Sequence, residues 1–180
     1  SVAGVQYWMK KVEEYTNGKV KFQHFPAGQM GKSTEMLNIV SAGMADVAYI
    51  ATPYYAGKTP LANGLGGLPM VYPDARVGSW AYWKTLLNEP VLSNDFLKNG
   101  IRPVFGWVTP GYEIFTAKMI IKTPGDIKGL KVRGAGGGLD KTLKALGAVP
   151  VYVPAPEIYQ ALQRGVLDGV AFSYGSAKAY

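Results

Sequence analysis

The chain has 180 residues and no cysteine, and its 19 basic against 12 acidic residues give a net charge of +7. The lack of cysteine excludes disulfide bonds, thiol catalysis and cysteine-ligated zinc. The basic residues form no run longer than two, so the concentrated basic stripe of a nucleic-acid-binding surface is missing and no nucleic-acid partner is expected.

No apolar run approaches the ~18–20 residues of a membrane span. The first residues also lack the basic and apolar regions of a signal peptide. Because the sequence opens at Ser1 without methionine, we expect processing or truncation ahead of it.

The first half of the chain is predicted to alternate helices and strands. Apolar residues at helical spacing predict a helix over 2–15, and Asn17-Gly18 ends it. Alternation at period two predicts a strand at 20–25. Ser33 is expected to cap a helix that runs to Ala42, and a short apolar strand follows at 46–51.

Residues 52–73 are rich in glycine and proline and predict a long irregular connection, of the kind that often carries function. A helix from Asp74 to Asn88 and a short helix before Asn99 follow. Two further strands are expected at 101–108 and 113–118.

The last third repeats the alternation. Thr123-Pro124-Gly125-Asp126 predicts a helix cap with proline at the first helical position. Strands and helices then alternate to the end, which indicates an α/β fold with mostly parallel pairing. The expected strands are 130–133, 149–153 and 166–174, and the expected helices are 139–146 and 156–164.

Two glycine motifs resemble nucleotide-binding loops. Gly28 to Ser33 resembles the end of a Walker A loop, but Pro26 stands where that motif needs a glycine. The loop 134–138 resembles a dinucleotide fingerprint, but Leu139 replaces its last glycine. Despite these departures, a nucleotide-binding α/β domain that uses the Gly28–Ser33 loop is kept as the alternative function.

Arg133 ends a predicted strand beside this second glycine loop and a helix N-terminus, where open α/β sheets bind ligands. A guanidinium at that place favours an anion. Aromatic residues at strand ends and in loops suggest a concave site with apolar walls. His24 is the only histidine and has no serine or cysteine partner pattern, so we expect a structural role for it and no catalytic residue. A histidine-based metal site needs more ligands than one, so no metal site is expected, and no cofactor is expected either.

Three ordered blocks resemble one protein family. Phe25 to Gly31 reads FPAGQMG, Thr123 to Arg133 reads TPGDIKGLKVR, and residues 143–169 carry LKALGAVP and EIYQALQRGVLDG. These blocks resemble the extracytoplasmic solute-binding proteins (DctP type) of tripartite ATP-independent periplasmic (TRAP) transporters.

The resemblance implies a two-lobed periplasmic solute-binding-protein fold of type II-like architecture, incomplete at both ends. Residues 1–115 would form lobe I without its first strand, and 116–180 part of lobe II. It also implies a periplasmic receptor without enzymatic activity, which closes on a small organic acid and delivers it to a TRAP membrane permease. Arg133 matches the arginine that forks onto a ligand carboxylate in this family.

Departures from the family pattern bear on the ligand. Phe172 stands where many relatives carry asparagine, and Glu113 stands where many carry a basic or polar residue. A second ligand carboxylate would be repelled by Glu113, so we expect a monocarboxylate with a polar or hydroxyl end. The alternative is that Glu113 meets a cation or a ligand amine. The candidate ligand-binding residues are Arg133, Glu113, Tyr54, Thr52, Gly136, Phe172 and Tyr174.

Overall fold

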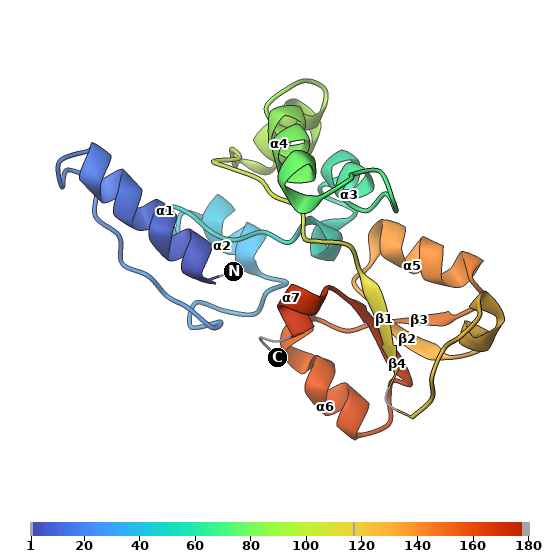
Figure 1. Ribbon diagram of the computed structural model, residues 1–180. Coiled ribbons are helices and arrows are strands. Elements are labelled where there is room, and N and C mark those ends of the chain that lie inside the picture. Colours follow the sequence, from blue (N-terminus) through green and yellow to red (C-terminus); the bar gives the residue numbers. More distant parts are fainter. Residues whose placement is uncertain (1, 117, 178–180) are drawn as a thin grey trace. The chain divides into compact units, whose positions relative to one another are not determined.

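The computed structural model describes residues 2–116 and 118–177 (Figure 1). The chain divides into two compact units, one up to Lys32 and one from Ser33 onward. The predicted lobe boundary at residues 115 and 116 falls inside the second unit and stays a prediction. Among the described helices, none is long and apolar enough to cross a membrane.

The first unit is built on one helix, α1 (Val2–Tyr15), as predicted. Asn17 and Gly18 both have positive φ, which ends the helix. The Trp8 ring packs against Phe22 with 5.2 Å between ring centres. The predicted strand at 20–25 is wrong, because a strand needs a partner for its N–H and C=O groups and the described part of this unit contains no other extended ladder.

The second unit begins with short helices. These are α2 (Met36–Ser41), the 3₁₀ turn η1 (Thr52–Tyr55) and α3 (Pro60–Gly66). The predicted cap at Ser33 is wrong, since Glu35 takes the N-cap position of α2 and no side chain caps it. Residues 52–73 were predicted to be irregular, but they contain both η1 and α3.

The predicted helix over 74–88 is confirmed as α4 (Ala75–Leu86). The Asp74 carboxylate accepts hydrogen bonds from the N–H groups of Arg76 and Val77, at 2.7 and 2.8 Å, which is how an N-cap stabilises the first turn. The short helix expected before Asn99 is a π-helical turn, η2 (Leu92–Phe96), continued by η3 (Leu97–Asn99).

The predicted strands at 46–51 and 101–108 are wrong. Both segments lie outside regular secondary structure, but their aromatic rings stack on one another. Trp107 stacks with Tyr49, at 5.1 Å, and with Phe105, at 5.4 Å, measured between ring centres. Apolar residues in these segments predicted strands, but neither segment is paired in a ladder with another strand in the described residues.

Four strands form a mixed sheet in the order β1-β4-β2-β3. They are β1 (Glu113–Thr116), β2 (Lys131–Gly134), β3 (Val149–Tyr152) and β4 (Gly169–Phe172). β2 is parallel to both β3 and β4, while β1 is antiparallel to β4. The carboxyl ends of β2, β3 and β4 and the start of β1 therefore meet at one edge, and the α/β class is confirmed.

Helices cover both faces of this sheet (Figure 1). Leu143 of α5 (Gly137–Ala145) packs with Val132 and Ala171 on one face. Ile158 of α6 (Ile158–Gln163) packs with Val170 and Phe172 on the other. Successive strand residues point to opposite faces, so Arg133, next to Val132, belongs to the α6 face.

The connections are short. The 3₁₀ turn η4 (Pro124–Ile127) carries the predicted cap, as Thr123 and Asp126 bond to each other's backbone in a capping box. The turn η5 (Ala155–Glu157) leads from β3 into α6, and the short helix α7 (Tyr174–Ala177) follows β4.

Candidate ligand-binding site at Arg133

Arg133 is the third residue of β2, and its side chain lies at the carboxyl edge of the sheet with only 1% of the residue exposed. Its Nε donates to the carbonyl oxygen of Val153 at 2.8 Å, and Nη1 donates to that of Ala171 at 3.4 Å. These acceptors follow β3 and belong to β4, so the two neighbouring parallel strands fix the guanidinium.

Tyr54 reaches the same guanidinium from η1. Its hydroxyl accepts a hydrogen bond from Arg133 Nη2 at 3.4 Å and another from the N–H of Ala155 at 3.0 Å. The adjacent Tyr55 anchors η1 by donating to the Ser33 carbonyl at 2.8 Å and accepting from Leu37 N–H at 3.2 Å. Burial raises the pKa of the Tyr55 phenol above its ordinary value, so this anchor stays protonated at neutral pH.

Aromatic rings surround the guanidinium. The Arg133 Cζ lies 5.2 Å from the centre of the Phe172 ring, within the range of a cation–π contact. Tyr54 meets Tyr152 edge to face at 5.9 Å, and Tyr112 meets Phe172 in the same way at 6.0 Å. Burial raises the pKa of the Tyr152 phenol, and the Arg133 charge opposes part of that rise. Aromatic rings therefore line the site, and the Tyr152 phenol is uncharged at neutral pH.

In the part of the chain that the structure describes, the Arg133 charge has no counterion. Among residues 2–116 and 118–177, no salt bridge of Arg133 to a carboxylate within 4.0 Å is found. A buried ion without a partner is expensive, because its desolvation is not repaid. A guanidinium has five N–H donors, and three are used here, which leaves two. Two donors are what one carboxylate needs for a bidentate contact.

Gly136 lets η1 approach the sheet. Its φ is +89°, and a Cβ there would lie 2.8 Å from the carbonyl oxygen of Pro53. A side chain would therefore push η1, and with it Tyr54, away from β2. Gly134 is similarly crowded, since a Cβ would overlap the carboxylate of Asp140.

The structure brings together some of the predicted site residues. Arg133, Tyr54 and Phe172 are in mutual contact through the guanidinium, and Gly136 adjoins them through Pro53. Glu113 is exposed at the same edge, opposite Phe172 in the β1–β4 register.

Thr52 and Tyr174 make different contacts. The Thr52 hydroxyl lies 3.3 Å from that of Tyr82, and the contacts found for it do not include Arg133. Tyr174 is 70% exposed and meets Phe115 edge to face at 5.0 Å.

Sequence reasoning missed Tyr152 and the two backbone carbonyls that hold the guanidinium. Tyr152 could have been found from its place at the end of the strand parallel to β2. Val153 and Ala171 contribute main-chain atoms, for which residue type carries no signal.

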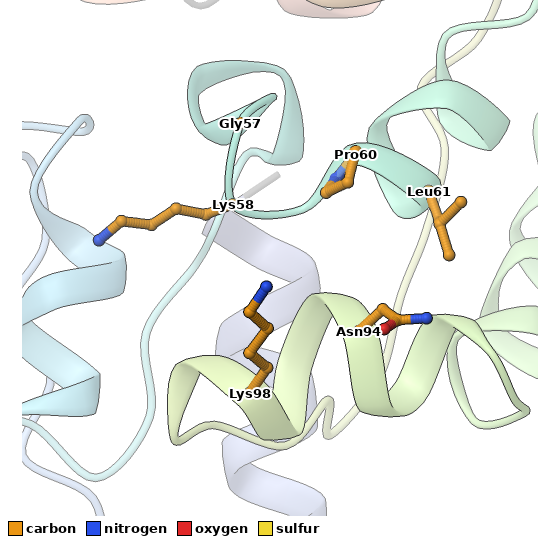
Figure 2. A pocket seen from close by; sticks show the side chains of 6 residues that line it. All are labelled: Gly57, Lys58, Pro60, Leu61, Asn94 and Lys98. Carbon is orange, nitrogen blue, oxygen red and sulfur yellow. The ribbon is translucent and has the colours of Figure 1, made fainter.

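A surface pocket lies away from Arg133. It has a volume of about 280 Å³, and Figure 2 shows it between the turn before α3 and the helical turns η2 and η3. Lys58 extends away from it and donates to Asn38 at 2.8 Å, while Lys98 points toward it. Another, of about 130 Å³, is lined mainly by apolar residues between Lys118 and Asp168. Arg133 lines neither of these two pockets, and its own side chain is buried.

The nucleotide-binding alternative is not supported. A Walker A loop needs a strand before it and a helix after it, so that backbone N–H groups converge on phosphate. No strand precedes Gly28 in the described residues, and α2 has six residues and begins only at Met36.

Comparison with known proteins supplies the family. The model of the bacterial extracellular solute-binding protein family 7, DctP, matches residues 1–178. The chain belongs to the DctP family. The resemblance of the three sequence blocks to TRAP solute-binding proteins is thereby confirmed.

DctP-family relatives share the fold along nearly the whole chain. The C4-dicarboxylate-binding periplasmic protein DctP of Rhodobacter capsulatus is 31% identical over 172 residues, covering 92% of this chain and 49% of the relative. A TRAP periplasmic solute-binding protein from Bordetella bronchiseptica, solved with bound mandelate, matches with a TM-score of 0.87 at 29% identity, covering 96% of this chain and 53% of that one.

A TRAP solute-binding protein from Rhodoferax ferrireducens, in complex with benzoate, has a TM-score of 0.85 at 31% identity, with the same coverage of 96% and 53%. The chain thus spans about half the length of these relatives. The family and its structural neighbours are solute-binding proteins of transport systems, not enzymes.

Proposed function

We propose that this chain forms the carboxylate-binding part of a TRAP solute receptor, with Arg133 as the residue that holds the ligand carboxylate. The buried guanidinium without a counterion is the observation that carries this proposal. Its two remaining N–H donors match one carboxylate, and an anion bound there would supply the charge that the described residues do not.

The ligand is an aromatic monocarboxylate. Phe172, Tyr54 and Tyr152 surround the guanidinium and would pack against an aromatic body. The exposed carboxylate of Glu113 at the same edge would repel a second ligand carboxylate. The Bordetella and Rhodoferax proteins, which hold mandelate and benzoate, support this class.

Ligand entry requires η1 to separate from β2. Arg133 is almost fully buried, and Tyr54 and Pro53 approach the sheet from a segment that lies before residue 115. We retain the two-lobed division at residues 115 and 116 as part of this proposal: lobe I presents η1, lobe II presents β2, and the ligand favours the closed state because it contacts both. The receptor would work in the periplasm and deliver its ligand to TRAP permease subunits.

Ligand-dependent thermal stability tests this proposal. The purified protein is heated with benzoate, mandelate, succinate, galacturonate, ATP or NAD. At a hundredfold excess over Kd a ligand adds about 2.7 kcal/mol to the free energy of unfolding. We expect benzoate or mandelate to raise the Tm, and succinate, ATP and NAD to leave it unchanged.

The matched variants are Arg133→Lys and Arg102→Lys. Lysine keeps the charge but loses the planar fork, so Arg133→Lys should weaken binding about a hundredfold, while the exposed Arg102 should tolerate the change. Stabilisation by ATP alone, or equal benzoate affinity in wild type and Arg133→Lys, would overturn the proposal.

A further inference from the structure

We infer that the Tyr54 hydroxyl is a third donor to the ligand carboxylate, and that this bond couples ligand binding to the closed position of η1. The inference rests on the proposed function of Arg133 and adds a specificity-determining residue to its site.

The Tyr54 hydroxyl has a proton to donate and no acceptor for it among the described residues. A phenol hydroxyl can accept two hydrogen bonds and donate one. Tyr54 already accepts two, from Arg133 Nη2 and from the N–H of Ala155. In the described part of the chain no acceptor lies within hydrogen-bond distance of its own proton. The hydroxyl is thus arranged as a donor whose acceptor must come from outside these residues.

The Tyr54 hydroxyl is also close to the free N–H groups of Arg133. It lies 3.4 Å from Nη2, the atom that still has a free N–H to offer. A carboxylate on the two free N–H groups of Arg133 would therefore place an oxygen within reach of Tyr54. A carboxylate has about four lone-pair sites, so it can accept all three donors.

Tyr54 and Arg133 lie on two separate elements, so a ligand that bonds to both would hold these elements together. Tyr54 and Arg133 are 79 residues apart and belong to η1 and β2. A carboxylate that bonds to both makes contacts that exist only when η1 is closed on the sheet. The ligand then shifts the population toward the closed state, because it has extra affinity for that state alone.

Tyr54→Phe tests the hydroxyl with benzoate as the probe and calorimetric titration as the measurement. Removing a buried hydrogen bond to a charged group should weaken benzoate binding at least tenfold. The matched control is Tyr159→Phe, which removes a hydroxyl from an exposed ring of α6 outside the site. It should change affinity less than twofold. An unchanged Kd in Tyr54→Phe would overturn the inference.

A fluorinated tyrosine at position 54 distinguishes two roles of the hydroxyl: donation to the ligand carboxylate, or only acceptance from Arg133 and Ala155. Fluorination makes the hydroxyl a stronger donor and a weaker acceptor. If Tyr54 donates to the carboxylate, 3-fluorotyrosine at this position should tighten benzoate binding at pH 6. If Tyr54 only accepts from Arg133 and Ala155, the same change should weaken binding, and that result would refute the inference.

Arg133→Lys keeps the two proposals distinguishable. Loss of binding in Arg133→Lys with wild-type affinity in Tyr54→Phe would refute the role of Tyr54 and leave the receptor function standing. Full binding in Arg133→Lys, or no binding of benzoate to the wild type, would refute the proposed site itself and the inference with it.

Discussion

The guanidinium of Arg133 lies over the ring of Phe172, with 5.2 Å between Cζ and the ring centre. Phe172 is buried and is the last residue of β4, beside the strand that carries Arg133. The ring thus covers one side of a cation whose in-plane N–H groups bond to backbone carbonyls and Tyr54. The cation–π contact partly offsets the missing counterion.

Replacing Phe172 by leucine should therefore reduce stability. Leucine keeps an apolar side chain but loses the ring face, and a desolvated cation–π contact contributes about 2 kcal/mol. With the loss of packing, we expect the free energy of unfolding to fall by about 2–3 kcal/mol. Urea denaturation measures it, and Phe96→Leu, at a ring that is about as buried as Phe172 but lies in a hydrophobic cluster, serves as the comparison. Equal losses in the two variants would contradict a special role for the Arg133 contact.

Gly136→Ala should destabilise the closed site. Alanine at a φ of +89° is strained, and its Cβ would meet the Pro53 carbonyl at 2.8 Å. We expect a loss of about 1–3 kcal/mol in the free energy of unfolding, together with weaker benzoate binding because η1 is pushed away from Arg133. Gly57→Ala is the control, since a Cβ there has no atom within 4 Å. A Gly136→Ala protein as stable as Gly57→Ala would refute the close approach.

The Asp126 cap should make stability depend on acid pH. Hydrogen bonds from the N–H groups of Lys122 and Thr123 lower the pKa of the Asp126 carboxyl below its ordinary value of 3.8. A group with a lowered pKa in the folded state stabilises above its unfolded pKa and stops doing so as the pH falls through its folded pKa.

Asp126→Asn should therefore lower the Tm at pH 6 and have a progressively smaller effect as the pH falls below about 4. Thermal denaturation between pH 6 and pH 2 measures this difference. Asp46→Asn, at an aspartate for which no hydrogen bond or ion pair is found in the described residues, should show no such convergence. A Tm difference for Asp126→Asn that does not change with pH would disprove the mechanism.

The helices and the four-stranded sheet could be predicted because their signals are local. The periodicity of 2–15 and the Asp74 and Thr123 caps placed α1, α4 and η4, and apolar runs placed β2, β3 and β4. Three other expected strands, at 20–25, 46–51 and 101–108, are wrong. Alternation at 20–25 and the apolar run at 46–51 are local signals, but a ladder also requires a partner strand, which a local signal does not supply.

The sequence by itself determined the family, the α/β class and the position of Arg133 at the end of a strand, because blocks of residues and local periodicity encode them. Only the tertiary structure decided what surrounds that arginine. Tyr54 is 79 residues away from it, and two of its acceptors are backbone carbonyls. Contacts over such distances depend on strand order and on how closely Gly136 lets η1 approach, and no pattern of neighbouring residues records either.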